Sequence, residues 1–199
     1  MAPEDPLAPA AAPGLQTLLT RRSVPALQLR EPGPSPRQID AAIDAALRAP
    51  DHGALRPWRF VLVQGQAREG LSQLLVSRMQ QREPDTPTAK LERIRSMPLC
   101  APLVIAVGAS LLAGHKVPEI EQLLATGAGV MNLLNAFHAQ GFGAIWLTGG
   151  NAYDPEVAQA LGFHAPERCL GFIYVGSVEP GDPAPRRVQR DACVRSWTG

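Results

Sequence analysis

Four short runs of consecutive apolar residues place the strongest constraint on how this chain can fold. They occupy residues 60–63, 103–107, 144–147 and 171–176. Runs of this length, bounded by turn residues, are typical of strands that are buried on both faces of a sheet. A helical pattern separates each run from the next. The sequence therefore predicts a three-layer α/β or α+β domain with helices on both faces of the sheet. The pattern does not give the order of the strands.

Helices are predicted at residues 15–22, 36–47, 67–82, 89–96, 117–140 and 154–161. The second of these carries the clearest signals. Ser35 and Gln38 form a capping-box pair with Pro36 in the first turn, and Pro50 follows the end of the helix. Between them, apolar residues recur at helical spacing on one face.

The predicted helix at residues 117–140 changes character along its length. Its first half is amphipathic, whereas residues 128–137 are apolar on nearly every side. A helix of this kind lies either in the centre of the core or in a subunit interface. Gly127 and Gly129 would allow another backbone to approach it closely.

Composition narrows the class of protein. The chain has 199 residues, enough for one domain or two small ones, and its 19 basic and 18 acidic residues nearly cancel. This balance argues against nucleic acid or a membrane surface as the partner. The three cysteines lack the spacing of a metal site or a disulfide framework, which indicates the cytoplasm, and no apolar run is long enough to span a bilayer. Residues 1–13 are predicted to be a flexible Pro/Ala-rich extension, and residues 14–199 a single domain with an extended C-terminal tail.

Familiar signatures of nucleotide binding and nucleophilic catalysis are absent. The sequence has no GxGxxG after a strand, no GxxxxGK[ST] and no GxSxG. Residues 21–23 (RRS) could bind an anion through two guanidinium groups and a hydroxyl, although a basic end of a helix is also common without any ligand. His52 lies in a Pro-rich loop before a strand, where site residues are frequent. Each of these two signals is weak alone.

Taken together in their order along the chain, several segments are much more specific. They are RRS at 21–23, RAPDH at 48–52, PWRF at 57–60, HKVP at 115–118, QGFGAIW at 140–146 and GFIYVG at 171–176. This set resembles the flavin-dependent nitroreductase family, in particular its short NAD(P)H nitroreductase branch. The resemblance covers about residues 15–178.

The resemblance implies an α+β fold with a central mixed β-sheet flanked by helices. It also implies a homodimer with two FMN molecules at the interface, each contacted by both subunits. The implied reaction is ping-pong: NADH or NADPH gives a hydride to FMN, and an electron-poor acceptor such as a nitroaromatic or a quinone then takes it. Because the flavin carries this chemistry, no catalytic side chain and no metal are expected.

The family's binding residues can be carried over position by position. Arg21 and Ser23 would hold the FMN phosphate, and Arg22 would reach the ribityl chain or a ring carbonyl. Arg48 would lie against the flavin of its own subunit, and His52 would reach the flavin of the partner. Trp146, Leu147 and Thr148 would line the ring and the ribityl chain. Residues 136–141 match the part of the branch linked with the nicotinamide cofactor.

Two positions depart from the pattern of this branch. Leu147 stands where an arginine is common, so one cation on the phosphate side is missing; Arg186, Arg187 or Arg190 in the tail could replace it. Arg56 stands where glutamine is usual and either adds a charge near the flavin or points to solvent.

The alternative to an enzyme is a flavin-binding protein of the same fold that does not turn over, or a chain that has lost FMN. Some relatives act on the flavin itself or on halogenated aromatics, but no residue here points to them.

Overall fold

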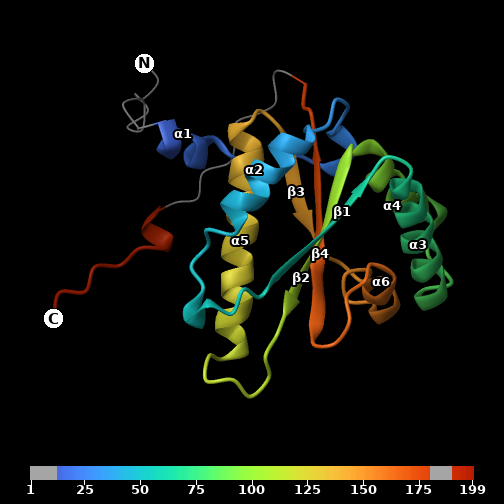
Figure 1. Cartoon of the computed structure of the whole chain (residues 1–199). Helices are drawn as coiled ribbons and strands as arrows, with labels where there is room; N and C mark the ends of the chain where they lie inside the picture. Colours follow the sequence, from blue (N-terminus) through green and yellow to red (C-terminus); the bar gives the residue numbers. More distant parts are fainter. Residues whose placement is uncertain (1–12, 180–189) are drawn as a thin grey trace.

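A computed structural model describes residues 13–179 and 190–199 of the chain (Figure 1). The predicted extension therefore lies outside the described residues, apart from Pro13, and so do Arg186 and Arg187. The helices are α1 Pro13–Thr20, α2 Pro36–Ala46, α3 Ala67–Arg82, α4 Thr88–Cys100, α5 Glu119–Ala139 and α6 Pro155–Ala160. The strands are β1 Trp58–Gln64, β2 Leu103–Ser110, β3 Gly143–Leu147 and β4 Glu167–Gly176, and short 3-10 turns cover Ala26–Gln28, His52–Ala54 and Arg190–Ala192.

The four strands form one sheet in the order β1-β2-β4-β3, and every pair of neighbouring strands is antiparallel. The expectation of a mixed sheet was therefore wrong for these strands. A single parallel bridge, between Ser23 and Ala144, occurs at the outer side of β3 among the described residues.

The helical connections explain this topology. Helices α3 and α4 pack against each other as a pair, so the chain returns to the end at which β1 finished and β2 runs antiparallel to β1. The single helix α5 instead carries the chain to the opposite end, so β2 and β3 are parallel to each other. Strand β4 lies between them and is antiparallel to both.

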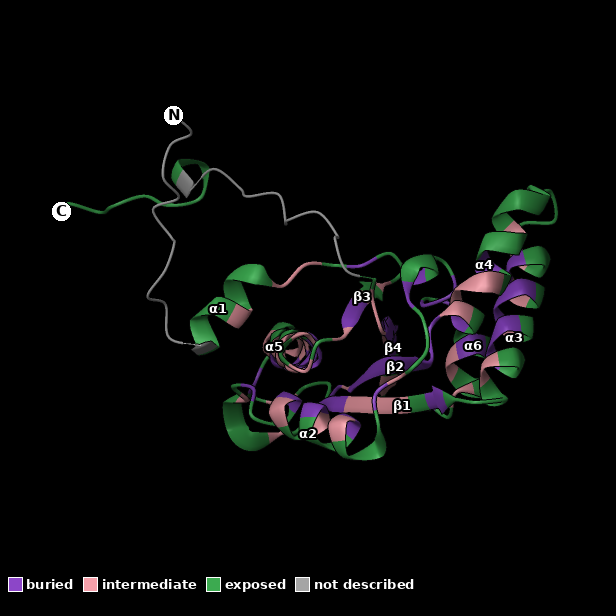
Figure 2. Ribbon diagram, turned by 90° about the horizontal axis from the view of Figure 1, so that it is seen from above, coloured by how far each residue is buried: buried purple, intermediate pink, exposed green. Residues whose placement is uncertain are grey.

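Helices cover both faces of the sheet, as predicted (Figures 1 and 2). Helices α2 and α5 bury alternate residues of the central strands, such as Ile105 and Ile173. Helices α3, α4 and α6 cover the other face, which carries Val104, Phe172 and Tyr174. Both faces of β2 and β4 are consequently apolar, which accounts for their continuous apolar runs.

The two largest differences from the predicted boundaries are in β4 and α4. Strand β4 begins at Glu167, before its apolar run, because the polar residues there still pair with the end of β2. Helix α4 continues through Pro98 to Cys100, with Ile94 and Pro98 buried on the same side. At the start of α2, the Gln38 side chain accepts hydrogen bonds from the Ser35 N–H and hydroxyl, both at 2.9 Å, as the capping box predicted.

Helix α5 presents an apolar stripe outward. Ile120, Leu124 and Met131 are 60%, 65% and 45% exposed, while Val130, Leu133 and Phe137 are buried against the sheet. None of the helices in the described ranges is long and apolar enough to cross a membrane. Within the same ranges, no three potential metal ligands cluster together.

Candidate functional site

The residues predicted to bind a ligand fall into two groups on the surface of the fold. Residues 21–23 lie beside the start of β3, near the C-terminal end of α5, and residues 146–148 lie at the other end of β3. Arg48 and His52 lie in the segment that follows α2, beside the N-terminal half of α5.

The first group begins where α1 ends. The Val24 N–H donates to the Ala144 carbonyl at 3.0 Å, and this bond fixes the chain around Ser23 alongside β3. The Thr20 hydroxyl lies 2.8 Å from Nε2 of His138, which ties the end of α1 to the last turn of α5. Arg21 and Arg22 are therefore held close to His138, and Ser23 is exposed beside them.

The surroundings of His138 are basic. Burial lowers the pKa of this imidazole, and the charges of Arg21 and Arg22 lower it further. Among the described residues, no carboxylate forms an ion pair with Arg21. Positive charge without a counter-ion is a suitable environment for a bound anion.

Trp146 is positioned by β4. Its Nε1–H donates to the Leu170 carbonyl at 3.2 Å, and the side chain is 37% exposed. Gly171 makes this arrangement possible. It has a φ of +128°, and a Cβ at this position would lie 2.5 Å from the Leu147 carbonyl oxygen and 2.7 Å from Nε1 of Trp146. Only glycine fits here without moving both residues.

The loop after Thr148 is fixed by a buried ionic cluster. Asp154, whose side chain is fully buried, accepts a hydrogen bond from Nε of Arg78 at 3.0 Å and another from Arg82. Arg82 also donates to Asn151, whose amide donates to the Leu75 carbonyl. Residues 149–151 are thus attached to α3.

The charge of Asp154 is stabilised by this cluster. Burial alone would raise the pKa of its carboxyl. Hydrogen bonds from Arg78 and Arg82, together with the backbone N–H groups of Glu156 and Val157, outweigh burial and hold the pKa below its usual value. The same backbone bonds make Asp154 the N-cap of α6.

The second group lies at the far end of α5. Nδ1 of His52 is 2.6 Å from a carboxylate oxygen of Glu121, and the imidazole is 65% exposed. These two residues line a cavity of about 330 Å³ together with Leu124 of the apolar stripe. Arg48 is exposed on the same side of the fold.

One chain does not bring the two groups together. At a rise of about 1.5 Å per residue, the stretch of α5 between Glu121 and His138 is about 26 Å long. This is longer than an extended FMN molecule. The structure therefore places residues 21–23 and 146–148 along β3 but separates residues 21–23 from His52. Arg56 is exposed with a φ of +51°, and its backbone N–H donates to the Asp51 carboxylate.

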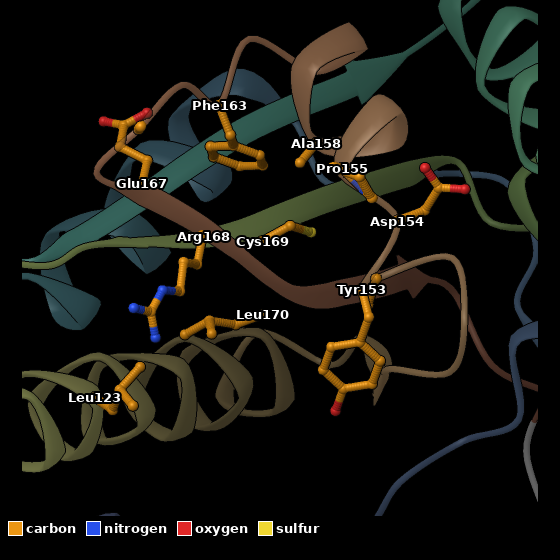
Figure 3. A pocket seen from close by; sticks show the side chains of 12 residues that line it. Leu123, Tyr153, Asp154, Pro155, Ala158, Phe163, Glu167, Arg168, Cys169 and Leu170 are labelled. Atoms are coloured by element: carbon orange, nitrogen blue, oxygen red, sulfur yellow. The ribbon is translucent and has the colours of Figure 1, made fainter.

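A larger cavity of about 550 Å³ lies where β3 ends and leaves one edge of β4 uncovered (Figure 3). Arg168 and Leu170 extend from β4 toward α5, which carries Leu123, and Tyr153 extends from the loop before α6. Because Trp146 bonds to Leu170, this cavity adjoins the first group.

Three features of the site were missed in the sequence. His138 lies within residues 136–141, which the resemblance links with the nicotinamide cofactor, but its contact with Thr20, beside the predicted anion site, was not predicted. Asn135, one turn earlier, has a buried Oδ1 atom with no hydrogen-bond partner among the described residues. The cluster around Asp154 joins α3 to α6. Aspartate is a residue type that favours the N-cap position, but no local pattern indicates the two arginines that pair with Asp154.

Comparisons with known proteins agree on one family. The model of the nitroreductase family matches residues 18–177. YdjA of Escherichia coli strain K12, which is named for NAD(P)H nitroreductase activity, is 36% identical over 179 residues, covering 86% of this chain and 96% of that protein. Among solved structures, a nitroreductase-like protein of Bacillus cereus superposes with a TM-score of 0.77 at 19% identity, covering 96% of this chain and 99% of the other. A nitroreductase of Desulfovibrio desulfuricans in complex with FMN gives a TM-score of 0.72 at 20% identity and covers 96% and 100%.

Proposed function

The chain belongs to the nitroreductase family, and from this premise we propose that it is an FMN-dependent oxidoreductase. It uses NADH or NADPH as hydride donor and passes the hydride to an electron-poor acceptor such as a nitroaromatic or a quinone. The family match covers nearly all of the described fold, and the similar proteins include one named for NAD(P)H use and one that binds FMN. The three cysteines are free thiols, which fits a reducing compartment such as the cytoplasm.

The residues of the first group fit FMN. Arg21 and Ser23 offer charge-assisted hydrogen bonds to a phosphate, and the end of β3 offers an exposed indole and a threonine beside it. The partnerless Oδ1 of Asn135 could accept a hydrogen bond from a ligand. Arg22 follows Arg21 on this side of the proposed site, whereas the Leu147 side chain packs against the core on the α3 and α4 face.

When bound, FMN supplies the hydride chemistry, and the side chains supply position and electrostatics. Trp146 presents its indole while its Nε1–H is held by Leu170. The Asp154 cluster keeps the loop after Thr148 in place. Gly171 leaves room for the Leu147 carbonyl next to that loop.

We further propose a homodimer in which α5 packs against its counterpart. The exposed Ile120, Leu124 and Met131 form one stripe that water would otherwise cover. A two-fold axis that pairs the helices antiparallel places the N-terminal end of one beside the C-terminal end of the other. His52 and Arg48 of one subunit would then approach residues 21–23 of the second, although the family resemblance assigns Arg48 to the flavin of its own subunit.

The separation of His52 from Arg21 along α5 is the observation that carries this proposal. Arg21→Ala and His52→Ala homodimers should each bind FMN about 10- to 100-fold more weakly, because each loses a charged or polar contact to the ligand. A heterodimer of the two variants, isolated through two different tags, has one site with both substitutions and one with neither. It should therefore bind one FMN with wild-type affinity. Two equally weak sites would contradict a site shared between subunits.

The cavity beside Trp146 is proposed to admit the acceptor. Its lining is mostly apolar, with Leu123, Tyr153 and Leu170 around a volume of about 550 Å³. A cavity of this size suits a flat molecule of one or two rings. This shape agrees with nitroaromatic and quinone acceptors.

A further inference from the structure

The imidazole of His52 is held by a carboxylate from another part of the chain. Nδ1 of His52 lies 2.6 Å from an oxygen of Glu121, which is 69 residues away in the sequence. A carboxylate has no hydrogen to donate, so the hydrogen in this contact belongs to Nδ1. In the neutral imidazole, Nε2 then carries a free lone pair and acts as an acceptor. Among the described residues, Nε2 has no hydrogen-bond partner of its own.

The backbone under both residues is fixed by buried contacts. Gly53, next to His52, has a φ of +77° and lies so close to Val117 that a Cβ there would be 3.2 Å from Cγ2 of that valine. Val117 is buried, and its carbonyl accepts a hydrogen bond at 3.0 Å from the buried Gln122 side chain. Gln122 directly follows Glu121, which is in the first turn of α5. The loop and the helix are therefore held together at this point, and the contact between His52 and Glu121 follows from the packing of the backbone.

The contact with His52 is the one ion pair that Glu121 forms within the described part of the chain. The side chains of His52 and Glu121 are 65% and 42% exposed, and an ion pair this accessible contributes little to stability. Both residues line the cavity of about 330 Å³ that Leu124 also lines, so the imidazole lies on the face that is proposed to meet the second subunit. The position that the contact gives to the imidazole explains it better than stability does.

We propose that Glu121 is a positioning residue for the cofactor: it holds the Nδ1–H of His52, so that Nε2 is the atom that accepts a hydrogen bond from FMN. This inference rests on the proposed function, in which His52 reaches the FMN of the second subunit. FMN offers two kinds of donor, the ring N3–H and the hydroxyls of the ribityl chain. Without Glu121, the imidazole is free to rotate and to carry its hydrogen on Nε2, which then cannot accept.

Two substitutions of Glu121 separate the effect of its accepting oxygen from the effect of replacing the side chain. FMN is titrated into the FMN-free full-length chain at pH 8. Glu121→Leu cannot accept from Nδ1–H and should bind FMN about 5- to 10-fold more weakly than wild type. Glu121→Gln keeps an oxygen that accepts and should bind FMN within about twofold of wild type. Adding Glu121→Leu to His52→Ala should weaken binding no further, because the two residues act as one unit.

Stability and a neighbouring carboxylate serve as controls. The urea midpoint of both variants should stay near that of wild type, since the pair is exposed. Glu119→Leu is the matched control. Glu119 is in the same turn of α5 and is 40% exposed, but it pairs with Arg168 at 3.4 Å. This variant should bind FMN as wild type does.

A measurement without FMN reports the hydrogen on the imidazole directly. Nitrogen-15 NMR at pH 8, with the signals of His52 assigned through His52→Ala, should place the hydrogen on Nδ1 in wild type and in Glu121→Gln. In Glu121→Leu it should shift toward Nε2. FMN methylated at N3 then distinguishes the two donors. The difference in affinity between wild type and Glu121→Leu should vanish with this analogue if His52 accepts from N3–H, and should persist if it accepts from a ribityl hydroxyl.

Each outcome decides the proposal. Weaker FMN binding by Glu121→Leu, together with the shift of the hydrogen, supports it. Equal affinity of wild type and Glu121→Leu, equally weak binding by Glu121→Gln, or an unchanged NMR spectrum overturns the role of Glu121 and leaves the proposed function standing. An affinity that His52→Ala does not change contradicts the shared site, and a wild-type chain that binds no FMN contradicts the proposed function. Either of these two results overturns this inference as well.

Discussion

Asp154→Asn should lower the free energy of unfolding by about 3 kcal/mol, because it leaves two partly buried guanidinium groups without their shared carboxylate. The Asp154 side chain is fully buried, and the side chains of Arg78 and Arg82 are also largely buried, with exposed fractions of 16% and 26%. Urea unfolding at pH 7 measures the change. Glu156→Gln is the matched control: it removes a carboxylate that also pairs with Arg78 but is 64% exposed. It should change stability by less than about 1 kcal/mol.

The difference in unfolding free energy between wild type and Asp154→Asn should depend on pH, in a direction set by the pKa of Asp154. The pKa of Asp154 in the folded chain lies below its usual value of 3.8. Its charge therefore contributes stability that is fully present above the unfolded pKa and is lost as the pH falls through the folded pKa. The gap between wild type and Asp154→Asn should be constant above about pH 5 and should narrow below about pH 4. If the difference in unfolding free energy does not change with pH, the Asp154 carboxylate is not the source of that difference.

Gly171→Ala should have the second large effect. The new Cβ would overlap the Leu147 carbonyl oxygen and Nε1 of Trp146, and the φ of +128° disfavours any side chain. We expect a loss of about 2–4 kcal/mol in the free energy of unfolding. FMN affinity should fall by at least about tenfold, because the end of β3 must move.

A second glycine separates the steric effect from the backbone effect. Gly141 also has a positive φ, of +86°, but a Cβ there would meet no atom within 4 Å among the described residues. Gly141→Ala should therefore destabilise the fold by about 1 kcal/mol and leave FMN affinity unchanged. Equal effects of the two substitutions on FMN affinity would show that Gly171 does not position Trp146.

The helices and strands could be predicted largely because their signals are local. The capping pair at Ser35 and Gln38 and the apolar run of β2 each depend only on neighbouring residues. The antiparallel sheet could not be predicted in this way. It depends on α3 and α4 packing as a pair and on β4 inserting between β2 and β3, and neither contact leaves a periodic pattern in the sequence.

The same distinction holds for the residues of the candidate site: some could be predicted from the sequence, and others depend on contacts between distant residues. Residues 21–23 and 146–148 could be proposed from family resemblance, and the structure places them along one strand. His138 lies within residues 136–141, which the resemblance links with the nicotinamide cofactor, but its contact with Thr20 could not be predicted, because the two residues are far apart in the sequence. The same is true of Asp154, whose charge is explained by arginines on α3.

The visible absorption spectrum of the purified protein, recorded before and after anaerobic addition of NADH or NADPH, tests the central claim most directly. The proposed function predicts a yellow protein with about one FMN per chain whose colour bleaches with at least one of the two nucleotides. A yellow protein that neither nucleotide bleaches would contradict the enzyme and favour a flavin-binding protein of the same fold. A colourless protein that FMN cannot reconstitute would contradict the assignment of Arg21, Ser23, Arg48 and His52 to a flavin site.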